Sequence, residues 1–253
     1  MLNALIVVAI VLFFMLYDVL LRIELVVHRR RRQDILQEYA WRTVRRIVAL
    51  FKTYGAFTLE FENRTIEGLP PRFLLVANHQ SLMDIPILIH LLAPIRLRFV
   101  AKHELGVALP LVSLMLRAQG QALIRRRGDA VQAMNGLMRF ARRCRRDGTC
   151  PAIFPEGTRS RDGRVGEFFT AGFRRMLETD PLPVVVVAIE GGWRISSLGT
   201  LLRNLRGTRY RVRILAVLSP PRGKKAIHEC LETARRLVAE EVSAMRDAPS
   251  PVP

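Results

Sequence analysis

Short apolar runs alternate along the chain with longer stretches of helical periodicity. The runs rich in β-branched and aromatic residues predict strands at Phe57 to Phe61, Phe73 to Ala77, Leu97 to Ala101, Ala122 to Ile124, Ala152 to Phe154, Val184 to Ile189 and Arg211 to Val217. The stretches between and after them predict helices at Met83 to Leu92, Gly106 to Met115, Ala130 to Arg146, Thr170 to Glu178 and Ala226 to Met245. This alternation favours an α/β fold with a mixed, partly parallel sheet flanked by helices.

The first segment of the chain is more apolar than the rest. Between Ala4 and Tyr17 there is no charged or strongly polar side chain, and the apolar run continues past Asp18 to Leu21. At 1.5 Å per residue, such a helix is about 27 Å long, close to the thickness of the hydrocarbon layer. Residues 1–27 are therefore expected to form a transmembrane or membrane-anchoring helix. A helix that lies in the membrane interface without spanning it is the alternative.

A basic segment follows at residues 28–56. It opens with the sequence HRRRR, which the positive-inside rule places on the cytoplasmic side of a membrane. Apolar side chains then recur at helical spacing, at Trp41, Val44, Val48 and Phe51, with arginines mostly on the other side. This pattern predicts a basic amphipathic helix. It either lies on the membrane surface or packs on the core with a solvated basic face, and both interpretations can hold together.

The composition of the chain favours a phosphorylated ligand. The formal net charge is +18, yet the mean hydropathy is positive, whereas nucleic-acid binders are normally basic and hydrophilic. Almost all of the positive charge is arginine, which suits bidentate contact with phosphate. The combination of high positive charge and positive mean hydropathy favours a protein that acts at an anionic membrane surface. The three cysteines show no C-x-x-C spacing, which indicates a reducing compartment and no zinc site.

The stretch VANHQSLMDIPI, from Val76 to Ile87, carries the first candidate chemistry. On one continuous helix, His79 and Asp84 would point about 140° apart. They can meet if His79 lies in the loop after the strand and Asp84 lies in the first helical turn, where the carboxylate would orient a general base. However, Ser81 to Asp84 also matches a capping box, which explains Asp84 without any chemistry. These residues alone leave both interpretations open.

A second polar stretch, FPEGTRSR, follows a later strand at Phe154 to Arg161. Pro155 and Gly157 predict a tight turn, and its guanidinium and hydroxyl groups suit a phosphate. A plain surface loop is the alternative. The stretch GQALIRRR, from Gly120 to Arg127, and Lys102 can add to the same positive field.

The ordered set NHQSLMD, GQALIRR and FPEGTRS resembles the motifs of the glycerolipid acyltransferase superfamily, in particular the 1-acylglycerol-3-phosphate acyltransferase family. The resemblance covers about Gly68 to Val217, and a membrane-attached N-terminus is also typical of the family. We expect an acyltransferase domain at residues 57–246, and the sequence of the tail at 247–253 favours disorder. The implied reaction transfers an acyl group from acyl-CoA or acyl carrier protein to the sn-2 hydroxyl of lysophosphatidic acid, which gives phosphatidic acid.

The resemblance also implies roles for single residues. His79 is the expected general base, and Asp84 is its orienting carboxylate, as in the family's H-x4-D motif. Substrate binding is expected from Gly120, Arg126, Glu156, Gly157, Thr158 and Arg159 and, in the sequence AKHEL, from Lys102. Two departures bear on the acceptor: Thr170 replaces a family lysine, and Val186 replaces a proline. The sequence EGTR, in contrast, favours lysophosphatidic acid over glycerol-3-phosphate.

The resemblance sets the expected partners and location. We expect membrane lipids as partners, no nucleic acid, no metal and no cofactor beyond the acyl thioester. The expected location is the inner, cytoplasmic membrane, with the catalytic domain on the cytoplasmic side. The alternatives are an acyltransferase for another lysophospholipid, a lyso-amino-acid lipid or glycerol-3-phosphate, and a non-catalytic protein that binds anionic lipid. Oligomeric state and acyl chain length are left open.

Overall fold

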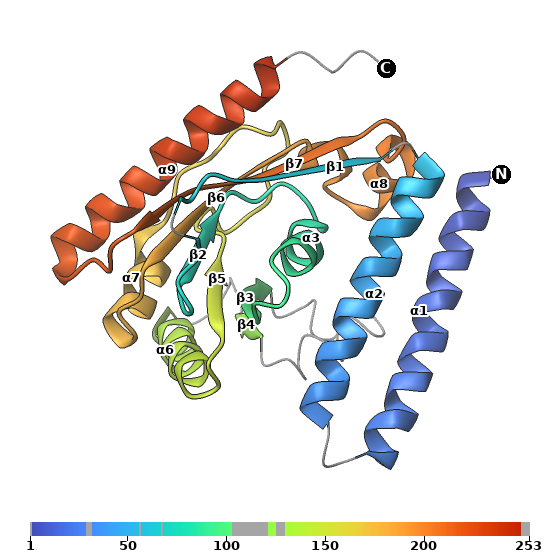
Figure 1. Cartoon of the computed structure of the whole chain (residues 1–253), viewed down its shortest axis with the longest axis horizontal. Coiled ribbons are helices and arrows are strands. Elements are labelled where there is room, and N and C mark those ends of the chain that lie inside the picture. Colours follow the sequence, from blue (N-terminus) through green and yellow to red (C-terminus); the bar gives the residue numbers. More distant parts are fainter. Residues whose placement is uncertain are drawn as a thin grey trace.

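A computed structural model describes residues 2–28, 32–55, 57–66, 68–102, 121–124 and 130–248. Its strands form one sheet in the order β1-β7-β6-β2-β5-β3-β4 (Figure 1). They are β1 (Thr58–Asn63), β2 (Leu74–Ala77), β3 (Leu97–Lys102), β4 (Ala122–Ile124), β5 (Cys150–Ile153), β6 (Val184–Glu190) and β7 (Arg209–Leu218). Strands β6 and β7 are antiparallel, and the other neighbouring strands are parallel. The predicted mixed, partly parallel sheet is confirmed.

Helices connect and flank these strands. They are α1 (Leu2–Val27), α2 (Arg32–Gly55), α3 (Asp84–Leu91), α6 (Ala130–Arg146), α7 (Thr170–Thr179), α8 (Leu198–Asn204) and α9 (Gly223–Asp247), with a 3₁₀ helix, η2 (Gly192–Ile195). The predicted elements that fall on described residues are present, with ends that differ by a few residues. The predicted helix Gly106 to Met115 lies outside the described residues. The sequence did not predict η2 or α8, because short elements carry too few residues to show a period.

The sheet separates two hydrophobic cores. One core lies between the sheet and helices α2 and α3, and the other lies between the sheet and helices α6, α7 and α9 (Figure 1). Strands β2 and β6 are buried along their whole length, and their side chains alternate between the two cores. Burial on both faces explains why these strands are uninterrupted apolar runs in the sequence.

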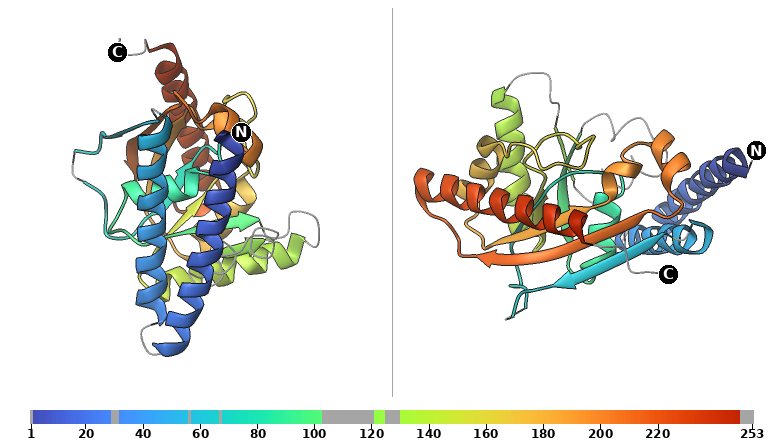
Figure 2. Two further views of the ribbon diagram at one scale, coloured as in Figure 1. Left: turned by 90° about the vertical axis from the view of Figure 1, so that its right-hand side faces the viewer. Right: turned by 90° about the horizontal axis from the view of Figure 1, so that it is seen from above.

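The first two helices form an antiparallel pair beside the sheet (Figures 1 and 2). The ring of Tyr17 packs edge-on against Tyr39, with 5.8 Å between ring centroids, and the guanidinium of Arg46 lies over the Tyr17 ring at 5.2 Å. The carboxylate of Asp18 pairs with Arg22 at 2.7 Å, one helical turn away. Aromatic and charged contacts thus join α1 to α2.

Helix α2 packs its apolar stripe on the globular core. Val44, Val48 and Phe51 are buried, and the ring of Phe51 meets Phe57 edge-on at 5.8 Å. Trp41 lies at the exposed end of the stripe, with Arg45 over its ring at 4.6 Å. Core packing of the amphipathic helix is therefore confirmed, and its contact with a membrane surface stays a prediction.

The expectation that the first helix spans a bilayer is not confirmed. Among the residues that the structure describes, no helix is long and apolar enough to cross a membrane. In its second half, α1 carries the charged side chains Asp18, Arg22 and Glu24.

Candidate functional site

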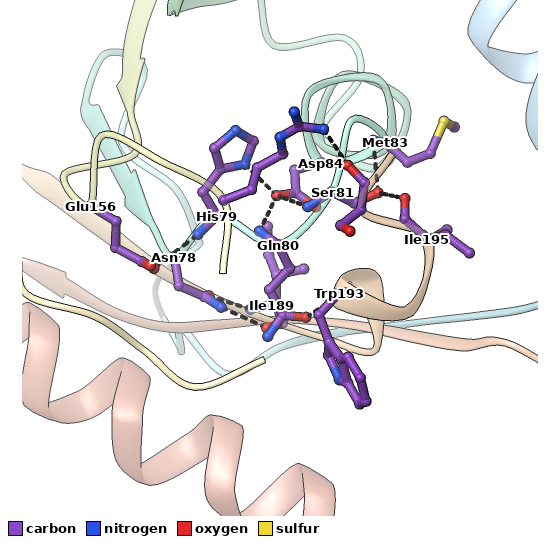
Figure 3. Close-up of polar contacts among 12 residues, drawn as sticks. Asn78, His79, Gln80, Ser81, Met83, Asp84, Glu156, Ile189, Trp193 and Ile195 are labelled. Carbon is purple, nitrogen blue, oxygen red and sulfur yellow. Dashed lines mark hydrogen bonds and ion pairs between the residues drawn. The ribbon is translucent and has the colours of Figure 1, made fainter. Parts of the chain in front are cut away.

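Three loops meet beyond the carboxyl ends of the parallel strands β2, β5 and β6. The backbone N–H of Ser160, after β5, donates to the carbonyl of His79, after β2, at 2.7 Å. The side chain of Asn78 exchanges two hydrogen bonds of 2.8 Å with the backbone of Ile189, near the end of β6 (Figure 3). Ligand sites of open α/β sheets lie at this edge, so the predicted motifs are placed where chemistry is expected.

His79 and Asp84 form the pair that the spacing allowed. The Nδ1 atom of His79 lies 2.6 Å from Oδ2 of Asp84. His79 lies in the loop after β2, and Asp84 is the first residue of α3, as expected. Asp84 is fully buried, whereas the His79 side chain is 15% exposed. The buried carboxylate can therefore orient a histidine that solvent and substrate can still reach.

The Asp84 carboxylate is held from several directions. Its Oδ2 atom accepts the backbone N–H groups of Gln80 and Ser81, at 2.7 Å and 2.9 Å. Its Oδ1 atom accepts the hydroxyl of Tyr210, from β7. Four polar contacts thus hold this carboxylate, three at Oδ2 and one at Oδ1.

The predicted capping box is only partly correct. Asp84 does accept the N–H of Ser81, which is one arm of the box. The other arm is displaced, because Ser81 Oγ accepts the N–H of Met83 at 3.1 Å and not that of Asp84. The helix begins at Asp84, and its N-cap residue, Met83, makes no side-chain cap. Ser81 therefore fixes the turn before the helix, because its hydroxyl also donates to the carbonyl of Ile195 at 2.7 Å.

The ring of His79 is fixed by stacking as well as by Asp84. It lies nearly parallel to the ring of Phe154, with 4.2 Å between centroids, and Phe154 stacks in turn on Phe99. Because Nδ1 faces Asp84, Nε2 is the ring nitrogen that can exchange a proton with a substrate. The neighbouring hydroxyl of Ser81 donates to Ile195, so Ser81 is not poised as a nucleophile for His79. This arrangement suits a base that acts on the hydroxyl of a bound molecule.

Glu156 supports the main chain of His79. Its Oε1 atom accepts the backbone N–H of His79 at 3.1 Å, and the carboxylate also accepts the N–H of Gly166. Burial raises the pKa of Glu156 to about 7, against the lowering effect of these hydrogen bonds. Figure 3 shows the carboxylate beside the backbone of His79. Its predicted contact with substrate stays a prediction.

The predicted tight turn after β5 is present. Gly157 has a φ of +65°, a left-handed conformation that favours glycine, and its N–H donates to the carbonyl of Phe154 at 3.1 Å. Thr158 is exposed, and Arg159 is partly buried, with one guanidinium N–H donated to the carbonyl of Ser196. Arg159 therefore ties the turn to the loop that follows β6.

Three of the predicted binding residues fall outside the described part of the structure, in whole or by their side chains. Gly120 and Arg126 lie outside the described residues. Lys102 ends β3, and its side chain is likewise outside the described part of the structure. Within the described ranges, no group of His, Cys, Asp and Glu side chains could hold a metal ion.

Sequence reasoning missed the residues that hold the loops together. Asn78 and Gln80 are buried, and Gln80 Nε2 donates to the carbonyl of Gly163 at 3.0 Å. Gly192 leaves room for the Tyr210 ring, because a Cβ at position 192 would lie 2.9 Å from Tyr210 Cε2. The two consecutive glycines after β6, Gly191 and Gly192, could have indicated this close packing from the sequence. Tyr210 offered none, since its partner lies 126 positions earlier.

Comparisons with known proteins identify relatives of this chain. A 1-acyl-sn-glycerol-3-phosphate acyltransferase of Brassica napus chloroplasts is 31% identical over 170 residues, which are 66% of this chain and 46% of that protein. A chloroplast enzyme of the same description from Arabidopsis thaliana is 28% identical over 204 residues, 79% of this chain and 53% of that protein. The chain thus spans about half the length of these curated relatives.

A solved structure resembles nearly the whole chain. The 1-acyl-sn-glycerophosphate acyltransferase PlsC from Thermotoga maritima superposes with a TM-score of 0.67 at 25% identity, over 95% of this chain and 98% of that one. The family described as Acyltransferase matches residues 60–190, more than half of the chain. This match includes His79, Asp84 and the turn at Gly157. The chain therefore belongs to the acyltransferase family.

Proposed function

We propose that this protein transfers a fatty acyl group from an acyl thioester to the sn-2 hydroxyl of 1-acyl-glycerol-3-phosphate. The observation that carries the proposal is the pairing of His79, partly exposed, with the buried Asp84 at the edge of the sheet. The relatives described as 1-acyl-sn-glycerol-3-phosphate acyltransferases support this acceptor. The thioester is acyl-CoA or acyl-acyl carrier protein.

The proposed reaction is a direct transfer. The acceptor oxygen attacks the thioester carbonyl while His79 Nε2 takes the hydroxyl proton, and the carbon–sulfur bond then breaks. The imidazolium returns the proton to the departing thiolate, so the histidine is regenerated. Asp84 stabilises the imidazolium while it exists, and the Phe154 ring keeps the imidazole in place. Binding both substrates beside His79 removes much of the entropic barrier of a bimolecular reaction.

Positively charged groups are proposed to bind the acceptor phosphate. Arg159 lies on the turn next to His79, because Ser160 hydrogen-bonds the His79 carbonyl. An arginine presents five N–H donors in a planar fork, which suits a phosphate. Arg126, Gly120 and Lys102 complete this proposed subsite on the strength of the family's motifs.

Membrane association is part of the same proposal, because the acceptor and product are lipids. We place the catalytic domain on the cytoplasmic side of the inner membrane. The exposed apolar side chains of α1 support the association with a membrane, and they lie at Leu12, Met15, Leu16, Val19, Leu20, Ile23, Val26 and Val27. Exposed apolar surface beside basic residues is typical of interfacial helices.

The function is tested with the purified protein in mixed micelles. Labelled acyl-CoA and acyl-acyl carrier protein are offered with a panel of acceptors: lysophosphatidic acid, other lysophospholipids, a lyso-amino-acid lipid and glycerol-3-phosphate. We expect turnover with lysophosphatidic acid, and a loss of at least about 100-fold in kcat for His79→Ala, because general-base catalysis contributes about 10²–10⁴.

A matched control tests whether substitution of any histidine lowers turnover. His228 is exposed on α9, and His228→Ala should retain wild-type turnover. Wild-type turnover by a folded His79→Ala protein would overturn the catalytic assignment. Turnover only with another acceptor would keep the chemistry and replace the substrate. Vesicle binding without turnover on any acceptor would instead favour a non-catalytic protein that binds anionic lipid.

A further inference from the structure

Tyr210 contacts the catalytic pair from a strand that none of the recognised motifs includes. It lies on β7, is fully buried, and donates its hydroxyl to Oδ1 of Asp84. We propose that Tyr210 is a positioning residue of the active site, which fixes the Asp84 carboxylate and, through it, the imidazole of His79. The proposal rests on the function proposed above and deepens it.

The division of donors between the two Asp84 oxygens supports this role. Oδ2 contacts His79 Nδ1 and two backbone N–H groups, whereas Oδ1 accepts the Tyr210 hydroxyl. The torsion about the Cβ–Cγ bond of an aspartate is soft, so contacts at one oxygen alone define the carboxylate plane poorly. A donor at the second oxygen fixes that plane. The direction in which Asp84 orients the imidazole is then fixed as well.

Tyr210 is itself rigidly held. Its ring contacts Phe57 at 6.1 Å between centroids, and its strand is paired on both sides, with β1 and with β6. Gly192 lies directly against the ring, where a side chain would collide with Cε2. Because the ring cannot shift, its hydroxyl holds a constant position relative to the carboxylate.

The hydroxyl is also a dependable donor. Burial, together with the charge of Asp84, raises the pKa of Tyr210 well above its ordinary value, so the phenol stays protonated at any physiological pH. The hydroxyl therefore keeps the proton that it donates to Oδ1 of Asp84 while His79 gains and loses its own.

The test is Tyr210→Phe, which keeps the ring and removes only the hydroxyl. The chain offers a matched control in Tyr39, whose hydroxyl hydrogen-bonds the carboxylate of Glu24 in the α1–α2 pair. Each variant is purified in the same micelles as the wild type, checked by circular dichroism and thermal unfolding, and assayed for kcat and for the KM of both substrates.

For Tyr210→Phe we expect kcat to fall about 10- to 100-fold, because a poorly oriented His79 loses part of the rate enhancement that a general base provides. Both KM values should stay within about twofold of wild type. Tyr39→Phe should keep the wild-type kcat. The split between kcat and KM is the readout that a merely structural role would not give.

The outcomes separate this inference from the proposed function. A folded Tyr210→Phe protein with wild-type kcat would overturn the positioning role and leave the function standing. A fall in kcat matched by Tyr39→Phe would overturn it too. Lack of turnover by the wild type on every acceptor would overturn both.

Discussion

Glu156 is a buried carboxyl group whose ionisation opposes folding. Burial raises its pKa from 4.5 to about 7, so the folded protein holds a proton that the unfolded chain has released. The contribution of Glu156 to stability is therefore greatest below pH 4.5 and is lost as the pH rises to 7. The full difference corresponds to about 3–4 kcal/mol of unfolding free energy.

Comparison with Glu156→Gln tests this pH dependence. The amide oxygen can still accept the His79 N–H, but the side chain no longer titrates. Relative to the variant, we expect the wild type to lose stability steadily between pH 4.5 and 7, as measured by urea unfolding at several pH values. Glu167→Gln, at an exposed position in the same region, should leave the slope unchanged. Parallel curves for wild type and Glu156→Gln would show that Glu156 does not titrate in this range.

At the scale of elements, the turn after β6 determines how closely β7 approaches the site. Gly191 has a φ of +89°, and a Cβ there would overlap the carbonyl oxygen of Arg209, at the start of β7. A side chain must therefore displace backbone, in addition to adopting a left-handed conformation. We expect Gly191→Ala to destabilise the protein by at least about 3 kcal/mol.

Gly207 provides the matched control for this turn. Its φ is +72°, but a Cβ there would have no atom within 4 Å. Gly207→Ala should therefore show only the backbone penalty, about 1 kcal/mol. Chemical denaturation of both variants measures the difference. Equal destabilisation would mean that the close approach of Arg209 contributes nothing beyond the left-handed backbone.

The strands and helices were predictable where the residue pattern that specifies them is local in the sequence. The buried strands β2 and β6 are continuous apolar runs, and α6 is amphipathic, with predicted ends at Ala130 and Arg146 that the structure confirms. His79 and Asp84 were predictable as a pair because they lie only five positions apart, and a strand end and a helix start stand between them. Local patterns thus predict the strands and allow the pairing of His79 with Asp84, whereas the catalytic role of the pair was expected only from the resemblance.

The remaining site contacts could not be predicted, because they depend on which strands become neighbours. Ile189 and Ile195 reach Asn78 and Ser81 only because β6 lies beside β2 in the folded sheet, and Tyr210 reaches Asp84 because β7 is the next strand after β6. Sequence periodicity carries no information about such pairings over more than 100 positions. The same holds for the contact of Glu156 with the His79 backbone.

Across the whole molecule, charge and apolar surface occur together at the paired helices α1 and α2. The net charge of +18 favours approach to anionic lipid, and this attraction weakens as salt screens it. The exposed apolar side chains of α1 add a hydrophobic contribution to membrane binding that salt does not screen. We therefore expect binding to anionic vesicles to fall with salt without disappearing.

Substitution of one exposed isoleucine separates the hydrophobic contribution to vesicle binding from the contribution of net charge. Ile23 on α1 is 56% exposed, and insertion of such a side chain into lipid contributes about 1.5–3 kcal/mol. Ile23→Gln should therefore lower the vesicle partition coefficient about tenfold, measured by co-sedimentation at fixed salt. Ile66→Gln, at a fully exposed position after β1, changes the same atoms without altering α1 and should bind as the wild type does. Equal binding by both variants would exclude the exposed face of α1 at Ile23 as the apolar contact and leave charge as the main attraction.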